Sequence, residues 1–403
     1  MFSFFKKPSE EISIIFDIGS GSVGAALVKF PADPRGSPTI LYSYREPLKF
    51  IPRPSSKRLL SVMLRLLSNV AKHVQRDGLS HVHLSYFTPT LQRVICVFSS
   101  PWYASQTKVL KIEKEKPFKI TQSFLDDIIK REDEQFKILL LEGGYEETFG
   151  PDVKVLEKKI IGTRLNGYEV KDPIDKEARE LEVTFLSSFI SSNILTSVEK
   201  VLHEVFHFRR VRFYSYALAS WNAVQHIFPS EEEFLFFDIG EEVTDITLTT
   251  KNVLVETVSV PLGRSLFLRQ VAKDLDVSAE ISLSYLKMYT TRTADKKFAD
   301  EIAAAVEKAQ TKYFDKLFEA LLGLGKRYSL PPHAFVTTDL DLANLFLDIL
   351  KRKLPAELNV PEGHFTVFLL GSETFKSHVE FAPYIAHDPF LALESIFIRN
   401  VIQ

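Results

Sequence analysis

Two aspartates, Asp17 and Asp238, lie in the same short motif, Phe-Asp-Ile-Gly, far apart in the chain. In both places the motif follows a run of apolar β-forming residues, so each aspartate is expected at the end of a strand. A carboxylate there can hold a magnesium ion or its water, and the glycine lets backbone amides surround an anion. One such turn is ordinary strand punctuation. Two copies in matched contexts indicate an internal duplication and favour a pair of phosphate-binding loops.

The elements that would position these aspartates are two β-meanders. Each motif is followed by a turn, a second strand and a third strand. These strands are expected over 23–30, 39–44, 243–250 and 253–260. Lys251 and Asn252 supply a tight hairpin turn inside the second meander. The same order of strands and turns therefore opens two halves of the chain.

Two strand–turn–strand phosphate loops that head two related halves resemble the actin, Hsp70 and sugar-kinase superfamily. Within it, the order of segments most resembles the bacterial FtsA/PilM branch, whose members are actin-like scaffolds of cell division and type IV pilus assembly. The resemblance implies an α/β protein with an actin-like ATPase fold. Two related β-meander/α halves are then expected, with an inserted α+β subdomain of the SHS2 or 1C type.

At 403 residues the chain is too long for one hydrophobic core. We expect the first half (1A) over 1–80, the 1C-like insertion over 81–185, a return to 1A over 186–228, and the second half (2A/2B) over 229–403. The last of these segments ends in a connecting helix, in which Asp388 is the predicted N-cap and Pro389 the first residue.

The insertion is predicted as two strands, a helix and three further strands. Its strands are expected over 93–99, 108–113, 153–162, 168–170 and 180–185, and its helix from 121 or 123 to 136. The segments that resemble 1C are 96–101, 120–127 and 166–173. In the family this subdomain contacts neighbouring subunits or partner peptides; the alternative is a solvated insertion without a partner.

Three predicted helices frame the meanders. One runs from Ser56 to Arg76 and is ended by Gly78, one covers 192–206, and one over 217–224 carries small residues. The last resembles the superfamily's connecting helix, whose small side chains let two helices cross closely at the hinge between the halves. Tight packing without a hinge would need the same residues.

The resemblance implies Mg-ATP as the cofactor, with Asp17 and Asp238 as the magnesium-binding residues. The residues expected beside the nucleotide are Asp17, Gly19, Ser20, Gly21, Ser22, Val23, Asp238, Gly240, Glu241, Glu242, Thr244, Asp245, Gly263 and Thr338. The first loop, with its glycines and hydroxyls, matches the family.

The second loop departs from the family, which commonly has two further glycines where this chain has Glu241 and Glu242. Two carboxylates beside the phosphates would repel them by about 1 kcal/mol or more per close pair, unless they point to solvent or gain a cation. The stretch 335–343, expected beside the adenosine, carries side chains where the family has glycines. We therefore expect weak or lost ATP binding and no efficient hydrolysis, and no general base can be named.

Composition narrows the classes of partner. A formal net charge of -2 gives no electrostatic reason to expect nucleic acid. One cysteine, Cys96, excludes an intramolecular disulfide and lies in an apolar run, where it is expected to be buried.

No stretch is apolar enough to span a bilayer, and no signal peptide precedes Asp17, so a cytoplasmic protein is expected. Residues 1–7, rich in Phe and Lys, are either an interfacial membrane foot or a frayed terminus.

Together these features predict an actin-like scaffold, cytoplasmic and peripheral to the inner membrane. It would organise a type IV pilus or a division assembly through protein partners at the cytoplasmic face, namely a peptide of a pilus inner-membrane protein or division proteins. Self-association is a further expectation. The Phe-Lys start and the absence of a C-terminal amphipathic membrane helix favour the pilus type. The alternatives are a scaffold that binds no nucleotide and a small-molecule kinase of the same superfamily.

Overall fold

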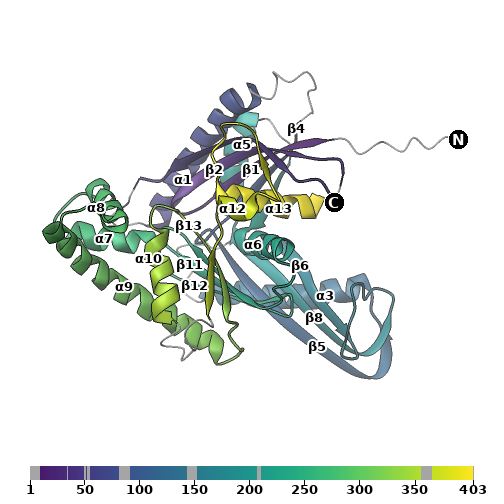
Figure 1. Cartoon of the computed structure of the whole chain (residues 1–403). Coiled ribbons are helices and arrows are strands. Elements are labelled where there is room, and N and C mark those ends of the chain that lie inside the picture. The colour runs from purple at the N-terminus through teal and green to yellow at the C-terminus, as the bar shows by residue number, and fades with distance from the viewer. Residues whose placement is uncertain are drawn as a thin grey trace.

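Three β-sheets organise the molecule in the computed structural model (Figure 1). The structure describes residues 10–33, 35–49, 51, 55–80, 91–142, 152–206, 210–354 and 365–402. The predicted membrane foot at 1–7 lies outside these residues. No helix among the described residues is both long enough and apolar enough to cross a membrane.

The first half is a six-stranded sheet in the order β15-β3-β2-β1-β4-β9. Its strands are β1 (Glu11–Ile18), β2 (Ser22–Phe30), β3 (Thr39–Pro47), β4 (Leu91–Phe98), β9 (Val211–Ser215) and β15 (Glu380–Phe381). Both faces are covered, because successive side chains alternate between them. Ile14 and Phe16 pack with helices α1 (Ser56–His73) and α5 (Ser192–Phe206). Ile15 packs on the other face with α6 (Tyr216–Ile227) and α13 (Pro389–Ile402).

Gly78 does not end the helix that contains α1, which corrects the prediction. A π-helical turn, η1 (Val74–Gly78), follows α1, and Leu79 still has helical backbone angles. A Cβ at Gly78 would lie 2.9 Å from the Tyr42 ring and 3.0 Å from a Leu27 methyl. The glycine is therefore required for close packing on the sheet rather than for a left-handed cap.

The second half repeats the same plan in a five-stranded sheet of order β12-β11-β10-β13-β14. Its strands are β10 (Phe234–Ile239), β11 (Thr244–Thr250), β12 (Val253–Val260), β13 (His333–Thr338) and β14 (Thr366–Leu369). Lys251 and Asn252 have φ of 51° and 61°, as a tight primed hairpin turn requires. In each half a parallel strand, β4 or β13, pairs with the strand that carries the aspartate.

Helices dominate the rest of the second half. They are α7 (Arg264–Asp274), α8 (Ala279–Thr291), α9 (Lys296–Gly325), α10 (Ala343–Asp348), the π-helical turn η2 (Ile349–Lys353) and α12 (Ser372–Phe375). One apolar stripe of α9, from Ile302 to Leu324, packs with the β10 and β11 side chains in a single core. Asp388 Oδ1 accepts from the backbone amides of Phe390 and Leu391, so the predicted N-cap of α13 is confirmed.

The third sheet is the inserted one, and it corrects the predicted order of two strands, a helix and three strands. It has the order β5-β8-β6-β7, with β5 (Tyr103–Lys119), β6 (Val153–Leu165), β7 (Tyr168–Glu169) and β8 (Glu177–Ser191), and is packed against α3 (Gln122–Glu142). The strand expected at 93–99 is β4, which belongs to the first half because its apolar residues, Cys96 included, are buried between β1 and β9. Figure 1 shows this sheet projecting away from α7, α8 and α9.

The inserted sheet is tied to the start of α6. Glu157, on β6, is buried and accepts hydrogen bonds from the Ser215 amide (3.1 Å), the Ser215 hydroxyl and the Ser188 hydroxyl (2.9 Å). The Tyr103 hydroxyl accepts from the Ala217 amide at 3.2 Å. Burial of Glu157 raises the pKa of its carboxyl to about 7. These bonds satisfy amides that a helix N-terminus otherwise leaves unpaired.

Candidate functional site

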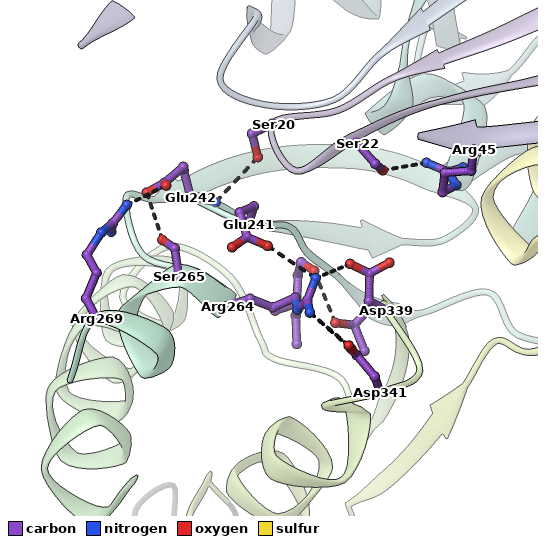
Figure 2. Close-up of polar contacts among 12 residues, drawn as sticks. Ser20, Ser22, Arg45, Glu241, Glu242, Arg264, Ser265, Arg269, Asp339 and Asp341 are labelled. Atoms are coloured by element: carbon purple, nitrogen blue, oxygen red, sulfur yellow. Dashed lines mark hydrogen bonds and ion pairs between the residues drawn. The ribbon is translucent and has the colours of Figure 1, made fainter. Parts of the chain in front are cut away.

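The two predicted loops face each other across the boundary between the halves. Both turns close in the same way: the Gly19 amide donates to the Ser22 carbonyl at 3.1 Å, and the Gly240 amide to the Val243 carbonyl at 3.0 Å. The Ser20 hydroxyl accepts from the Glu242 amide at 3.4 Å, across the gap (Figure 2). The structure thus brings the two motifs together, as the duplication predicts.

In the first loop, Asp17 is paired with an arginine. Its Oδ2 lies 2.7 Å from Nη2 of Arg45, on β3, and the carboxyl is 3% exposed. The same guanidinium lies 2.6 Å from Asp388 and donates to the Ser22 hydroxyl at 2.8 Å, the contact drawn in Figure 2. The Arg45 guanidinium is therefore paired with the Asp17 carboxylate, which was predicted to hold magnesium.

A further carboxyl lies behind Asp17. Glu394, on α13, is fully buried, and in its protonated form it can donate a hydrogen bond to Asp17. Burial raises the pKa of Glu394 well above its ordinary value, and the charge of Asp17 raises it further. Burial also raises the pKa of Asp17, although Arg45 opposes this shift. The Arg45 guanidinium is therefore the counter-charge near three carboxyl groups, those of the buried Asp17 and Glu394 and of the half-buried Asp388.

In the second loop, Asp238 has a neutral partner. Its Oδ1 accepts a hydrogen bond from the Thr337 hydroxyl at 3.0 Å, and no ion pair to it is found in the described part of the chain. Burial raises the pKa of Asp238 well above its ordinary value, and the nearby charge of Asp245 adds to this shift. Both shifts disfavour the charged form of the carboxyl, which is the form that binds magnesium.

The two glutamates of the second loop gain cations from the protein itself. Glu241 lies 3.2 Å from Nη1 of Arg264, and Glu242 lies 2.5 Å from Nη2 of Arg269 and accepts from the Ser265 hydroxyl at 2.9 Å. Burial raises the pKa of Glu241 to about 7, with Arg264 opposing the shift. The carboxylates are compensated internally, so neither arginine is a free cation for phosphate.

Arg264 also contacts the stretch that was predicted to lie beside the adenosine. Its guanidinium lies 2.5 Å from Asp339 and 3.1 Å from Asp341, two carboxylates of the stretch that follows β13 (Figure 2). Thr338 is buried, and its hydroxyl donates to the Ile239 carbonyl at 3.2 Å. The polar groups on this side therefore bond to one another.

The remaining predicted residues have roles inside the fold. A Cβ at Gly263 would lie 2.2 Å from the Gly240 carbonyl oxygen, so only glycine allows this approach. The Thr244 hydroxyl donates to the Leu262 carbonyl, and the Asp245 carboxylate accepts from the Ser100 and Ser259 hydroxyls at 2.6 Å each. Val23 is fully buried in the core. None of these contacts leaves a side chain directed at a ligand.

The cavity between the loops is too small for a nucleotide. It measures ≈ 40 Å³ and is lined by both loops together with Arg45, Asp339 and Phe390. Pockets for small molecules usually measure about 300–1,000 Å³. An ideal Cβ on Gly21 would lie 2.7 Å from Cβ of Glu241, which shows how closely the loops meet. In this arrangement the residues present do not fit Mg-ATP.

Three residues that decide this arrangement were not predicted: Arg45, Arg264 and Glu394. Arg264 directly follows Gly263, at the start of a helix, and this position was the available signal. Arg45 lies in a strand of mixed polarity that also carries Glu46, and Glu394 lies in a largely apolar helix that also carries Arg399. Because each element has a second charged residue, neither Arg45 nor Glu394 stood out in the sequence.

Comparison with known proteins gives matches of structure. No family model matches the chain, and no curated protein matches it. A chain of the PilM–PilN type IV pilus biogenesis complex is similar, with 13% identity and a TM-score of 0.63 over 96% of this chain and 98% of that chain. A Bacteroides thetaiotaomicron protein with an actin-like ATPase fold shares 12% identity over 99% of each chain, with a TM-score of 0.43.

The similarity to the pilus complex, which extends along almost the whole of both chains, agrees with two related meander halves and an inserted sheet. At this level of identity it shows the fold. The chain has the actin-like ATPase fold that its two Phe-Asp-Ile-Gly motifs predict.

Proposed function

We propose that this chain is an actin-like scaffold of the PilM type that has lost ATP binding. It organises a membrane-associated assembly from the cytoplasmic face of the inner membrane and performs no phosphoryl transfer. The observation that carries this proposal is that Arg45 and Arg264 already neutralise the carboxylates of the inter-loop site. The similarity to a chain of the PilM–PilN complex supports a pilus-type role over a division role.

A thermal unfolding experiment tests the loss of ATP binding. A ligand that binds only the folded state stabilises it by about 2.7 kcal/mol at a hundredfold excess over Kd. We expect no change in Tm on addition of millimolar Mg-ATP to the purified protein. A rise in Tm that both Asp17→Ala and Asp238→Ala abolish would contradict the proposal, because the two loops would then form one nucleotide site.

The partner we propose is a short cytoplasmic peptide of an inner-membrane protein. The candidate docking surface is the cavity of ≈ 690 Å³ between the inserted sheet and the β11–β12 hairpin. Its lining combines apolar side chains, such as Val109 and Val253, with charges of both signs, such as Arg164 and Glu182. Such a lining can hold an extended segment by its side chains and fix its direction by its charges.

Fluorescence anisotropy with labelled cytoplasmic tails of inner-membrane proteins encoded beside this chain tests the partner. Val109→Arg puts a bulky charge into the cavity, and we expect it to weaken binding at least tenfold. Ile138→Arg, on α3, is the matched control, since both side chains are 52% exposed. Binding of a division protein, unaffected by Val109→Arg, would favour the division type instead.

A further inference from the structure

We propose that Glu241 and Arg264 form a built-in plug, which holds the two halves of the molecule closed without a nucleotide. The plug comprises the Glu241 side chain, the Arg264 guanidinium and the two carboxylates that it contacts, Asp339 and Asp341. This inference rests on the proposed loss of ATP binding and gives it a mechanical role. The chain itself supplies the group that bridges the halves.

Glu241 occupies the gap between the loops. Its side chain is 13% exposed and packs against Gly21 of the first half, where no side chain stands in its way. A nucleotide phosphate would have to displace this carboxylate, or lie beside its charge. The Glu241 side chain therefore fills part of the gap and also gives the gap a negative charge.

Arg264 fixes Glu241 in that position. Its side chain is 11% exposed and contacts three carboxylates, which belong to the second loop and to the stretch after β13. Its backbone amide donates to the Gly240 carbonyl at 3.0 Å, so the start of α7 is joined to the same loop. Because the Arg264 and Glu241 side chains are largely buried, solvent and salt screen their pair weakly, whereas Asp339 is 41% exposed and its pair with Arg264 is screened more strongly.

The closure is completed by direct bonds between the halves. The Glu242 amide donates to the Ser20 hydroxyl, and the Ser100 hydroxyl, at the end of β4, donates to the Asp245 carboxylate at 2.6 Å. Opening the gap would break both bonds and expose Glu241. These bonds and the plug therefore stabilise the same closed state.

Hydrogen exchange of the full-length chain tests the plug. Arg264→Met removes the charge and retains much of the volume, and Glu241→Gly removes the side chain from the gap. We expect either change to raise amide exchange at least tenfold in both loops, 17–23 and 238–245. Arg327→Met is the control, since it breaks an exposed ion pair with Glu256 in the same half, and we expect it to leave both loops unchanged.

The first loop decides the outcome, because it belongs to the other half. Faster exchange confined to 238–245 would show that these contacts only stabilise their own loop, and it would overturn the plug. Exchange at the wild-type rate in both variants would overturn it as well. If Arg264→Met fails to fold, Glu241→Gly provides the same readout. Protection of wild-type 17–23 by Mg-ATP would also overturn the plug. Partner binding and its loss in Val109→Arg test the scaffold role separately, so the plug and the scaffold role can fail independently.

Discussion

The two Phe-Asp-Ile-Gly motifs have the same strands and turns around them but different electrostatic partners. Asp17 lies beside a guanidinium, that of Arg45, whereas Asp238 accepts from the Thr337 hydroxyl and has no ion pair within the described residues. Both carboxyls are buried almost completely. The first is therefore part of a charged group with one cation, and the second is a buried acid whose neutral form is favoured. An identical motif therefore does not fix the charge state of its aspartate.

Removing the cation of the first loop should have the largest effect on stability. Arg45→Met leaves the buried Asp17 and the half-buried Asp388 without this counter-charge, and we expect a loss of about 3–5 kcal/mol in the free energy of unfolding. Urea denaturation measures it. Arg35→Met, at a side chain 96% exposed, is the control and should change stability by less than about 0.5 kcal/mol. Equal stability of the two variants would show that Asp17 does not depend on Arg45.

Replacing the second aspartate, Asp238, should raise stability relative to the wild type as pH increases. Because the pKa of Asp238 is raised on folding, its contribution to stability is complete below the unfolded value of 3.8 and is lost as pH rises toward the folded value. Asp238→Asn removes this titration and retains an acceptor for Thr337. We expect the stability of the variant relative to the wild type to increase as pH rises above 3.8, by up to about 1.4 kcal/mol per pH unit.

Urea midpoints of both proteins, measured across that pH range, check the prediction. A difference in stability that stays constant with pH would mean that Asp238 is ionised in the folded protein. In that case the two loops would be electrostatically alike.

Two glycines of the first loop allow a test of the contact between the two loops. Gly21→Ala would place a methyl group 2.7 Å from Cβ of Glu241, and we expect it to cost about 1–3 kcal/mol through overpacking. At Gly19 the nearest atom is the Ser22 carbonyl oxygen at 3.4 Å, an ordinary contact. Gly19→Ala should therefore be neutral, or stabilise by up to about 1 kcal/mol. Thermal unfolding of both variants tests whether the loops meet at Gly21.

Much of the fold could be predicted from local sequence. The repeated motif and the Lys251-Asn252 hairpin identified two meanders. The strand at 93–99 was assigned to the wrong sheet because an apolar run does not reveal which neighbour it pairs with. The predicted domain boundaries and nucleotide contacts stay predictions.

The arginine pairing could not be predicted, because the pairs join residues distant in sequence. Asp388 meets Arg45 only through the packing of α13 on the first sheet, and Asp341 meets Arg264 through the β13 end. The repulsive effect of Glu241 and Glu242 was foreseen together with its remedy, a cation. The sequence did not indicate that the chain itself supplies that cation.

The attachment of the inserted sheet has a consequence for modularity. Its first and last strands leave the first half side by side, with Tyr103 paired to Ile190, so the chain path alone would allow the whole module to be exchanged as a cassette. Glu157 and Tyr103 restrict such an exchange, because they satisfy the first amides of α6. Any replacement module must bring an acceptor to the same two amides. Grafting is thus limited by hydrogen-bond chemistry at one helix end rather than by topology.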